Sequence, residues 1–301
     1  MCGIVGQIAF FDQAVSMQGE EISPLLIALM ARRGPDDEGV WSDGRGVTLG
    51  FRRLAVLDLS PTGHQPMRTQ DGRYVIVYNG EVYNFRELRQ ELEQEGVRFR
   101  STGDTEVVLY ALAHWGTRAL SRFNGMFALG FYDAGERRLL LARDHAGIKP
   151  LYSMLTSRGL VFASQYDQIL AHPWSQPLDI SREALALYLR MGYLPAPYAL
   201  LQNTHMLEPG TWLEMTSESR MRRGRFFAFP VYGEPNLRGA EAYEAVDTAV
   251  TAAVRRHLVS DVPVGTFLSG GIDSPLVAAK MRAVSNGPVR AFTIGTNGDQ
   301  W

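Results

Sequence analysis

The chain contains a single cysteine, and it is the second residue. One cysteine excludes an internal disulfide framework and a cysteine-rich zinc site, so the fold must depend on its apolar core. This cysteine content is typical of proteins in a reducing compartment. Removal of Met1 would place a thiol and a free α-amino group on Cys2. Because an α-amino group titrates at about pH 8, close to a thiol, it can act as the base for the same residue. We therefore interpret Cys2 as a candidate N-terminal nucleophile.

Composition places the chain among soluble globular proteins. Its 301 residues are 46% hydrophobic and 21% charged, which is ordinary for such proteins and sufficient for two domains. The net charge of −2 comes without a long run of like charge, so neither nucleic acid nor a membrane surface is an expected partner. The first 31 residues lack Lys and Arg, and no apolar run reaches the length of a membrane span. We expect a cytoplasmic protein.

Predicted strands dominate the first two thirds of the chain. Residues 3–10 alternate with a period of two, which predicts a strand at a sheet edge with Cys2 at its tip. Residues 73–78 predict a second strand that ends in a turn at Asn79 and Gly80. Four further short strands are expected over residues 127–132, 139–143, 151–155 and 160–163.

Helix signals separate and follow these strands. A compact helix is expected over residues 22–30, and another begins at Asn84 with Glu87 in a capping-box arrangement and ends before Gly96. A third helix covers 105–115, with Asp104 as its N-cap. A fourth covers 182–191. The stretch from 194 to 235 is rich in Pro and Gly and predicts connecting segments with strand ends only.

The pattern changes at Gly239. A helix to about residue 259 is followed by a strand over 262–268, a helix over 273–284 and a strand over 289–294, the alternation of an α/β domain with a parallel sheet. We therefore predict a first domain over 1–215, a linker over 216–238 and a second domain over 239–301.

The densest motif lies between the predicted strand at 262–268 and the following helix and consists of Ser269, Gly270, Gly271, Ile272, Asp273 and Ser274. Glycines let backbone N–H groups approach an anion, serine hydroxyls donate hydrogen bonds, and the helix N-terminus attracts negative charge. Asp273 would repel a bare phosphate, so it is a candidate Mg²⁺ ligand. The plainer alternative is a capped glycine turn. No lysine of the Gly-x4-Gly-Lys type is present.

This motif resembles the pyrophosphate loop of the ATP pyrophosphatase superfamily, which activates acyl groups as adenylates. Together with Cys2 it makes the whole chain similar to the glutamine-dependent asparagine synthetases of the B type. The other matching strings are those at 1–6, 33–36, 52–58, 78–84, 102–106, 124–128 and 143–152.

The resemblance implies a fold and a first site. The expected fold is an α+β N-terminal-nucleophile sandwich (αββα, antiparallel sheets), followed by an incomplete α/β ATP pyrophosphatase-like domain. Cys2 would attack the glutamine amide, and Asn79 with the N–H of Gly80 would form the oxyanion hole. The glutamine site would comprise Arg53 at the α-carboxylate, Asp104 at the α-ammonium, Asn79, Gly80 and Glu81. Taken singly, Asn79-Gly80 could be a turn, Asp104 an N-cap and Arg53 a surface ion pair.

The resemblance also implies a synthetase site that binds ATP and Mg²⁺, with aspartate as acceptor. Its nucleotide contacts would be Leu268, Ser269, Gly270, Gly271, Asp273, Ser274 and Ile294, and its metal ligand Asp273. Only 27 residues follow Ser274, so we expect this domain to be truncated and the chain to retain the glutaminase half. Two alternatives stay open: an amidotransferase for another carboxylate, and a non-catalytic glutamine-binding fragment, which a persistent Met1 would favour. The sequence leaves a homodimer open.

Overall fold

The computed structural model of the protein describes residues 1–10, 24–176, 178–231, 233 and 236–295. The chain divides into two compact units, Met1–Phe229 and Pro230–Trp301. The division falls within the 216–238 stretch that the sequence predicts as a linker.

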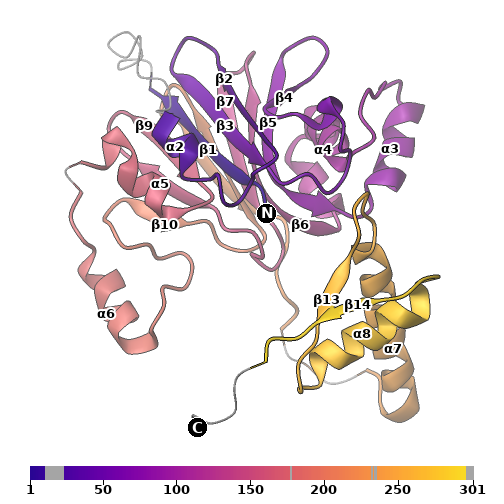
Figure 1. Ribbon diagram of the computed structural model, residues 1–301. Helices are drawn as coiled ribbons and strands as arrows, with labels where there is room; N and C mark the ends of the chain where they lie inside the picture. Colours follow the sequence, from indigo (N-terminus) through magenta and orange to yellow (C-terminus); the bar gives the residue numbers. More distant parts are fainter. Residues whose placement is uncertain (11–23, 177, 232, 234–235, 296–301) are drawn as a thin grey trace. The chain divides into compact units, whose positions relative to one another are not determined.

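The first unit is built on two six-stranded antiparallel sheets (Figure 1). In spatial order, the first sheet contains β10 (Thr204–Met206), β8 (Tyr152–Leu155), β9 (Gly159–Ala163), β1 (Gly3–Ala9), β3 (Val47–Arg53) and β2 (Asp37–Ser42). The second contains β12 (Met221–Arg225), β11 (Thr211–Thr216), β7 (Arg138–Arg143), β6 (Gly125–Asp133), β5 (Tyr74–Val82) and β4 (Met67–Arg68).

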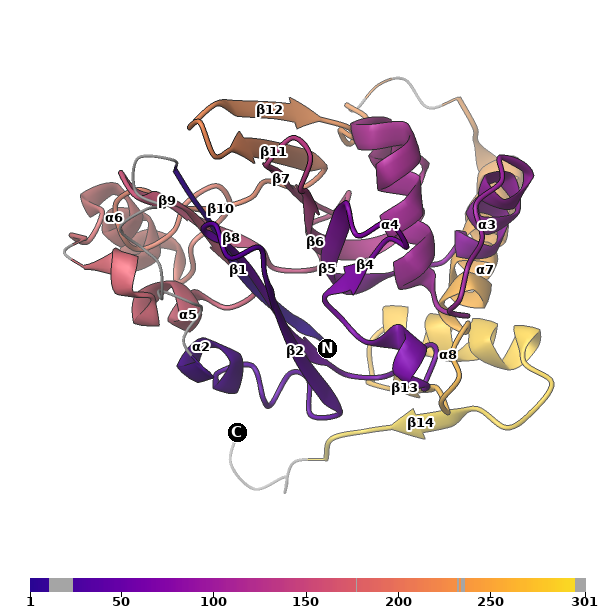
Figure 2. The ribbon, with the colours of Figure 1, turned by 90° about the horizontal axis from the view of Figure 1, so that it is seen from above.

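Helices cover the outer faces of both sheets. The inner faces enclose one apolar core, to which Ile4, Phe51 and Leu141 contribute. Outside the first sheet lie α2 (Pro24–Ala28) and α5 (Tyr166–Ala171), and outside the second lie α3 (Phe85–Gln94) and α4 (Asp104–Trp115), as Figure 2 shows. Each buried leucine or isoleucine stabilises such a layer by about 1.5–3 kcal/mol. The expected αββα sandwich is confirmed.

Strand β1 is central in its sheet, so the prediction of an edge position was wrong. It pairs with β3 on one side and β9 on the other, and all seven of its residues are buried. Val5 packs towards the helices and Ile4 towards the second sheet. Alternate side chains of β1 therefore enter two different apolar layers. Cys2 precedes a strand in the middle of the sheet.

Most predicted helices are present, with local differences. α6 (Arg182–Met191) has the predicted bounds. The first helix comprises only Pro24–Ala28, and residues 22 and 23 lie outside the described part. Asn84 precedes α3 without capping it, because its side chain accepts from the N–H of Asn124 and donates to the carbonyl of Arg122 instead. Within its described residues the unit also has 3-10 turns at Pro61–Gly63, Gly116–Arg122 and Pro173–Ser175.

Several strands were not predicted. β2 and β3 are absent from the sequence-based assignment, as is α5. The stretch 194–235 is also more regular than expected, because β11 and β12 form a full antiparallel pair within it. β12 is an exposed, arginine-rich edge strand, so its polar sequence gave no strand signal.

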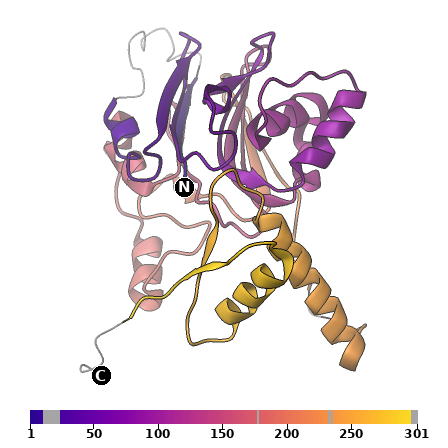
Figure 3. The same cartoon turned by 45° about the vertical axis from the view of Figure 1, so that its right-hand side comes forward.

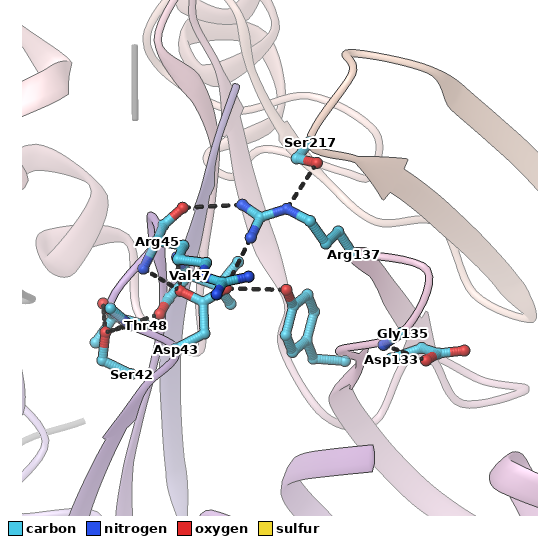
Figure 4. Close-up of polar contacts among 11 residues, drawn as sticks. Ser42, Asp43, Arg45, Val47, Thr48, Asp133, Gly135, Arg137 and Ser217 are labelled. Atoms are coloured by element: carbon cyan, nitrogen blue, oxygen red, sulfur yellow. Dashed lines mark hydrogen bonds and ion pairs between the residues drawn. The ribbon is translucent and has the colours of Figure 1, made fainter. Parts of the chain in front are cut away.

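A polar cluster ties the two sheets together at the turns (Figure 4). Asp43, in the β2–β3 turn, accepts from the N–H of Arg45 (2.7 Å) and from the hydroxyl of Tyr132 (3.0 Å). Arg137, in the β6–β7 turn, contacts Asp43 at 3.5 Å and donates to the carbonyl of Arg45 and to Ser217 Oγ. The cluster lies at the end of β1 opposite to Cys2, because Ala9 bonds to Gly46 in the same turn.

We expect Arg137→Ala to lower the free energy of unfolding by about 2 kcal/mol, because it leaves the nearly buried Asp43 carboxylate without its cation. Urea unfolding followed by fluorescence measures the loss. Arg220→Ala is the matched control, since the Arg220–Glu218 pair is exposed and contributes little. Equal stability of the two variants would show that the cluster does not hold the sheets together.

The second unit contains α7 (Gly239–His257), β13 (Gly265–Phe267), α8 (Asp273–Val284) and β14 (Arg290–Phe292). The two strands pair in parallel, which confirms the predicted alternation, and Figure 3 shows the helices beside them. Among the described residues of this unit, Val254 and Met281 are the buried hydrophobic ones. Phe267, Ile272 and Ile294 are more than three quarters exposed.

Candidate functional site

Cys2 is held at the start of β1 by backbone contacts. Its Sγ accepts a hydrogen bond from the N–H of Leu54 (3.4 Å) and lies 3.6 Å from the carbonyl oxygen of the same residue. Arg33 Nε donates to the Cys2 carbonyl at 2.9 Å. Leu54 directly follows β3, which pairs with β1. The sheet therefore fixes the thiol beside an N–H donor that can stabilise a thiolate.

The ionisable neighbours of the thiol come from several segments. Burial raises the pKa of the Cys2 thiol, and Glu81 raises it further, whereas the Leu54 hydrogen bond, the N-terminal amino group and Lys149 lower it. Burial lowers the pKa of the α-amino group, which belongs to Met1 in this structure. A lowered pKa raises the fraction of unprotonated amine near neutral pH, and only the unprotonated amine can accept a proton as a base.

Asn79 and Gly80 lie inside β5, so the predicted turn is wrong. They pair with Ala128 and Phe127 of β6. Asn79 is 1% exposed, and its Nδ2 has no hydrogen-bond partner among the described residues. A buried amide donor without a partner costs about 1–3 kcal/mol, which a protein tolerates where a ligand accepts the bond. Asn79 thus offers a fixed donor to a bound molecule.

Asp104 is the first residue of α4 rather than its N-cap. Its carboxylate accepts from the hydroxyl of Tyr78 and the N–H of Val82, both at 2.8 Å, and so connects the helix to β5. Burial raises the pKa of Asp104 to about 6, and these hydrogen bonds oppose the rise. The site therefore contains a carboxylate that is still mainly charged at neutral pH and that an ammonium ligand would stabilise.

Arg53 is 8% exposed and faces its own loop. Its guanidinium donates to the carbonyls of Ser60 and Leu57, both at 3.1 Å, and to that of Asp58. A guanidinium has five N–H donors, so these bonds orient Arg53 without using every donor. Arg53 is not the surface ion pair considered as an alternative; its neighbour Arg52 forms one, with Glu38.

Sequence reasoning gave no role to Lys149, which the structure places near this site. Lys149 is 5% exposed; burial lowers the pKa of its ammonium, and Glu81 and Cys2 oppose this lowering. Its motif, residues 143–152, was recognised only as a matching string. One signal was available: the thirty basic residues include two lysines, Lys149 and Lys280.

The glycine motif of the second unit forms a loop between β13 and α8. Ser274 Oγ accepts from the N–H of Ser269 (2.9 Å) and lies 2.8 Å from Ser269 Oγ. Gly270 and Gly271 do not have positive φ, and a side chain at Gly270 would meet nothing within 4 Å. Neither backbone strain nor packing therefore requires glycine here. The glycines leave the backbone open to a ligand.

Residues at the edge of the parallel pair flank this loop. The N–H of Leu268 donates to the carbonyl of Phe292 (2.8 Å), and Ile294, just beyond β14, is 86% exposed. Asp273 begins α8 and is exposed. In the described part of the chain no group of three or more His, Cys, Asp or Glu side chains could hold a metal ion. A lone carboxylate fits a magnesium ion whose other ligands are phosphate oxygens and waters.

Comparison with known proteins adds independent information. Residues 1–227 match the family model of the glutamine amidotransferase domain, and residues 245–300 match that of asparagine synthase. The chain is 34% identical to "Asparagine synthetase [glutamine-hydrolyzing] 1" of Bacillus subtilis over 98% of its own length and 46% of that protein. It is also 34% identical to "Putative asparagine synthetase [glutamine-hydrolyzing] 2" of Methanocaldococcus jannaschii, over 99% of the chain and 60% of that protein.

Among solved structures, the fold is similar to that of a glutamine phosphoribosylpyrophosphate amidotransferase from Bacillus subtilis. The TM-score is 0.52 at 17% identity, over 97% of this chain and 65% of that one. This likeness supports the fold alone. The chain spans about half the length of the Bacillus relative. No helix in the described ranges is long and apolar enough to cross a membrane.

Proposed function

We infer the function of this chain from one premise: it belongs to the glutamine amidotransferase family, with asparagine synthase sequence at residues 245–300. We propose that the first unit hydrolyses glutamine at Cys2 and that the ammonia serves an asparagine synthetase reaction. The observation that carries the proposal is the buried amide of Asn79, whose Nδ2 has no partner among the described residues.

The reaction at Cys2 has two stages. After removal of Met1, the α-amino group takes the thiol proton, and the thiolate attacks the amide carbon of glutamine. The resulting tetrahedral oxyanion collapses, and the same amino group returns the proton to the departing nitrogen, which leaves as ammonia. Water then hydrolyses the thioester to glutamate and regenerates the thiol.

The oxyanion needs fixed donors. Asn79 Nδ2 is proposed as one of them and the N–H of Gly80 as the other, because both residues lie on β5 with backbone positions set by pairing to β6. Gly80 admits no side chain without displacing that strand, since a Cβ there would lie 2.5 Å from the carbonyl oxygen of Met126. The rigidity of β5 thus favours preorganised donors over donors that must move into place.

The rest of the glutamine site is proposed from charge. Asp104 and Glu81 would bind the α-ammonium, and Arg53 the α-carboxylate, for which a planar guanidinium is suited. The site would favour glutamine over glutamate. The neutral side-chain amide of glutamine can be buried beside the Asn79 amide, whereas burial of the glutamate carboxylate would need a cation to pair with it.

We predict that kcat/KM for glutamine falls as the pH decreases through about 6, because Asp104 has a pKa of about 6 and loses its charge below it. Initial rates of glutamate release between pH 5 and 8 measure the profile. In Asp104→Asn the component of the acid limb near pH 6 should disappear, only the component from protonation of the α-amino base should stay, and the whole profile should lie lower. An acid limb retained unchanged in that variant would assign it to another group.

Ionisation of Asp104 has the opposite effect on folding stability: it favours substrate binding but lowers the free energy of unfolding. The folded-state pKa of Asp104 is raised from 3.8 to about 6, so its ionisation opposes folding above pH 6. This destabilising contribution is relieved as the pH falls from about 6 to about 4.

The second unit is proposed to belong to the synthetase half. The Ser269–Ser274 loop would hold the phosphates of ATP, with Asp273 on Mg²⁺ and with Leu268 and Ile294 beside the nucleotide. When bound, ATP would activate the aspartate side-chain carboxylate as an adenylate for attack by ammonia. The residues of this chain would bind and orient the phosphates through the open backbone at Gly270 and Gly271.

The test is release of glutamate from glutamine by the purified chain, in the absence of ATP and with the N-terminal mass determined on the same sample. We expect glutamate and ammonia in equal amounts. Asparagine production on addition of aspartate and MgATP would assign the acceptor, and production of another amide would favour a different carboxylate. Saturable glutamine binding without hydrolysis by a correctly processed chain would support the binding fragment instead. We further propose a cytoplasmic location and a homodimer, which gel filtration tests.

A further inference from the structure

Lys149 lies at the end of the 144–149 loop, whose backbone is held by many hydrogen bonds. Asp144, which follows β7, accepts four backbone N–H bonds with its carboxylate, those of Phe127, Ala146, Ile148 and Lys149, at 2.9–3.1 Å. Arg143 donates from the other side to the carbonyls of Gly147, Lys149 and Leu207, at 2.6–2.7 Å. The backbone position of Lys149 is thereby fixed.

Lys149 is a cationic residue in a buried position. It is 5% exposed, and burial lowers the pKa of its ammonium. Burying an uncompensated cation costs several kcal/mol, so negative charge must be close by. Asp144 already directs both oxygens at backbone N–H groups. Asp144 Oδ2 accepts the N–H groups of both Phe127 and Lys149, and Phe127 pairs with Gly80, the residue before Glu81, so the loop brings Lys149 beside this part of β5. Glu81 and the Cys2 thiol are accordingly the other acidic groups that act on Lys149.

We propose, on the basis of the proposed glutaminase function, that Lys149 is a positioning residue: its ammonium balances the Glu81 carboxylate, which otherwise opposes ionisation of Cys2. The charged groups around the thiol are the α-amino group, Glu81 on β5, Lys149 and Arg33, whose Nε donates to the Cys2 carbonyl; Asp144 also acts on Lys149. With Lys149 in place, the thiolate lies next to a nearly neutral pair. Without it, the thiolate meets the half-buried carboxylate of Glu81 with no cation beside it.

The experiment is the pH dependence of Cys2 alkylation by iodoacetamide, with the N-terminal mass confirmed. Because Cys2 is the only cysteine, the label reports on one thiol. In Lys149→Met we expect the midpoint of the rate profile to rise by about one pH unit, so that the alkylation rate at pH 7 falls about tenfold. In Lys149→Arg, which keeps the positive charge, the midpoint should stay close to that of the wild-type chain. Lys280→Met is the matched control, since the only other lysine pairs with Asp247 in the second unit.

A midpoint in Lys149→Met equal to that in Lys280→Met would overturn the proposal, even if glutaminase activity were lost, because such a loss would be structural. If Lys149→Met does not fold, Glu81→Gln in the otherwise unchanged chain decides the question. Removal of the carboxylate should lower the midpoint, and an unchanged midpoint would overturn the proposal. Alkylation requires no turnover. An inactive wild-type chain would therefore count against the proposed function, separately from this result.

Discussion

Replacing Cys2 by alanine is expected to reduce glutamate release by about 10⁴-fold or more, to the level of the reaction without enzyme. The reason is that no other thiol exists in the chain and the α-amino group that serves as base is attached to the same residue. Coupled detection of glutamate at saturating glutamine measures the effect.

Two controls make this result specific. Cys2→Ser keeps a hydroxyl and the α-amino group but lacks thiolate reactivity, so it should bind glutamine normally and turn over very slowly. Arg137→Ala changes the distant polar cluster and should retain its turnover rate when folded. Glutamate release by Cys2→Ala at a rate close to wild type would exclude Cys2 as the nucleophile.

Asn79→Ala is expected to lower kcat by about 100- to 1,000-fold with a much smaller change in KM, because the amide would act mainly on the transition-state oxyanion. The free energy of unfolding should change little in comparison, since Nδ2 has no hydrogen bond to lose within the described structure. Steady-state kinetics and urea unfolding on the same preparation separate the two effects.

The comparison variant for Asn79 is Asn84→Ala. Asn84 uses its side chain to bridge Arg122 and Asn124, so its replacement should cost stability and leave kcat nearly unchanged. If Asn79→Ala lost stability but kept kcat, the amide would be a structural group and the proposed oxyanion hole would need another donor.

Local sequence predicted the elements that are defined by local signals. The hairpin of β6 and β7 has an apolar run on each side of a turn, and α6 has an N-cap serine and a C-terminal glycine. The loop at Ser269 was also placed correctly between strand and helix, because glycine and serine there follow an apolar run.

Elements that depend on distant partners were missed or misjudged. Asn79-Gly80 is a common turn sequence, but pairing with β6 keeps it in an extended strand. Gly50 suggests an interruption, yet it lies inside β3, where its missing side chain leaves room for Ile27 from α2. The burial of β1 on both faces likewise depends on helices far away in sequence.

In the candidate site, too, some features follow from local sequence and others depend on distant partners. The motif strings made Cys2, Asn79 and Asp104 candidate site residues, because the resemblance assigns them roles. The charges around the thiol could not be predicted, since the position of Lys149 relative to Glu81 and Cys2 depends on the loop that Arg143 and Asp144 hold. Sequence spacing contains no information on that proximity.

The central claim is that glutamine acylates Cys2. The most direct measurement is peptide mass spectrometry of the wild-type chain after brief incubation with glutamine and rapid acid quench. The account predicts an adduct on the N-terminal peptide with the mass of glutamine minus ammonia, sensitive to hydroxylamine and absent from Cys2→Ala. Glutamate release without any such adduct, together with full activity of Cys2→Ala, would contradict it.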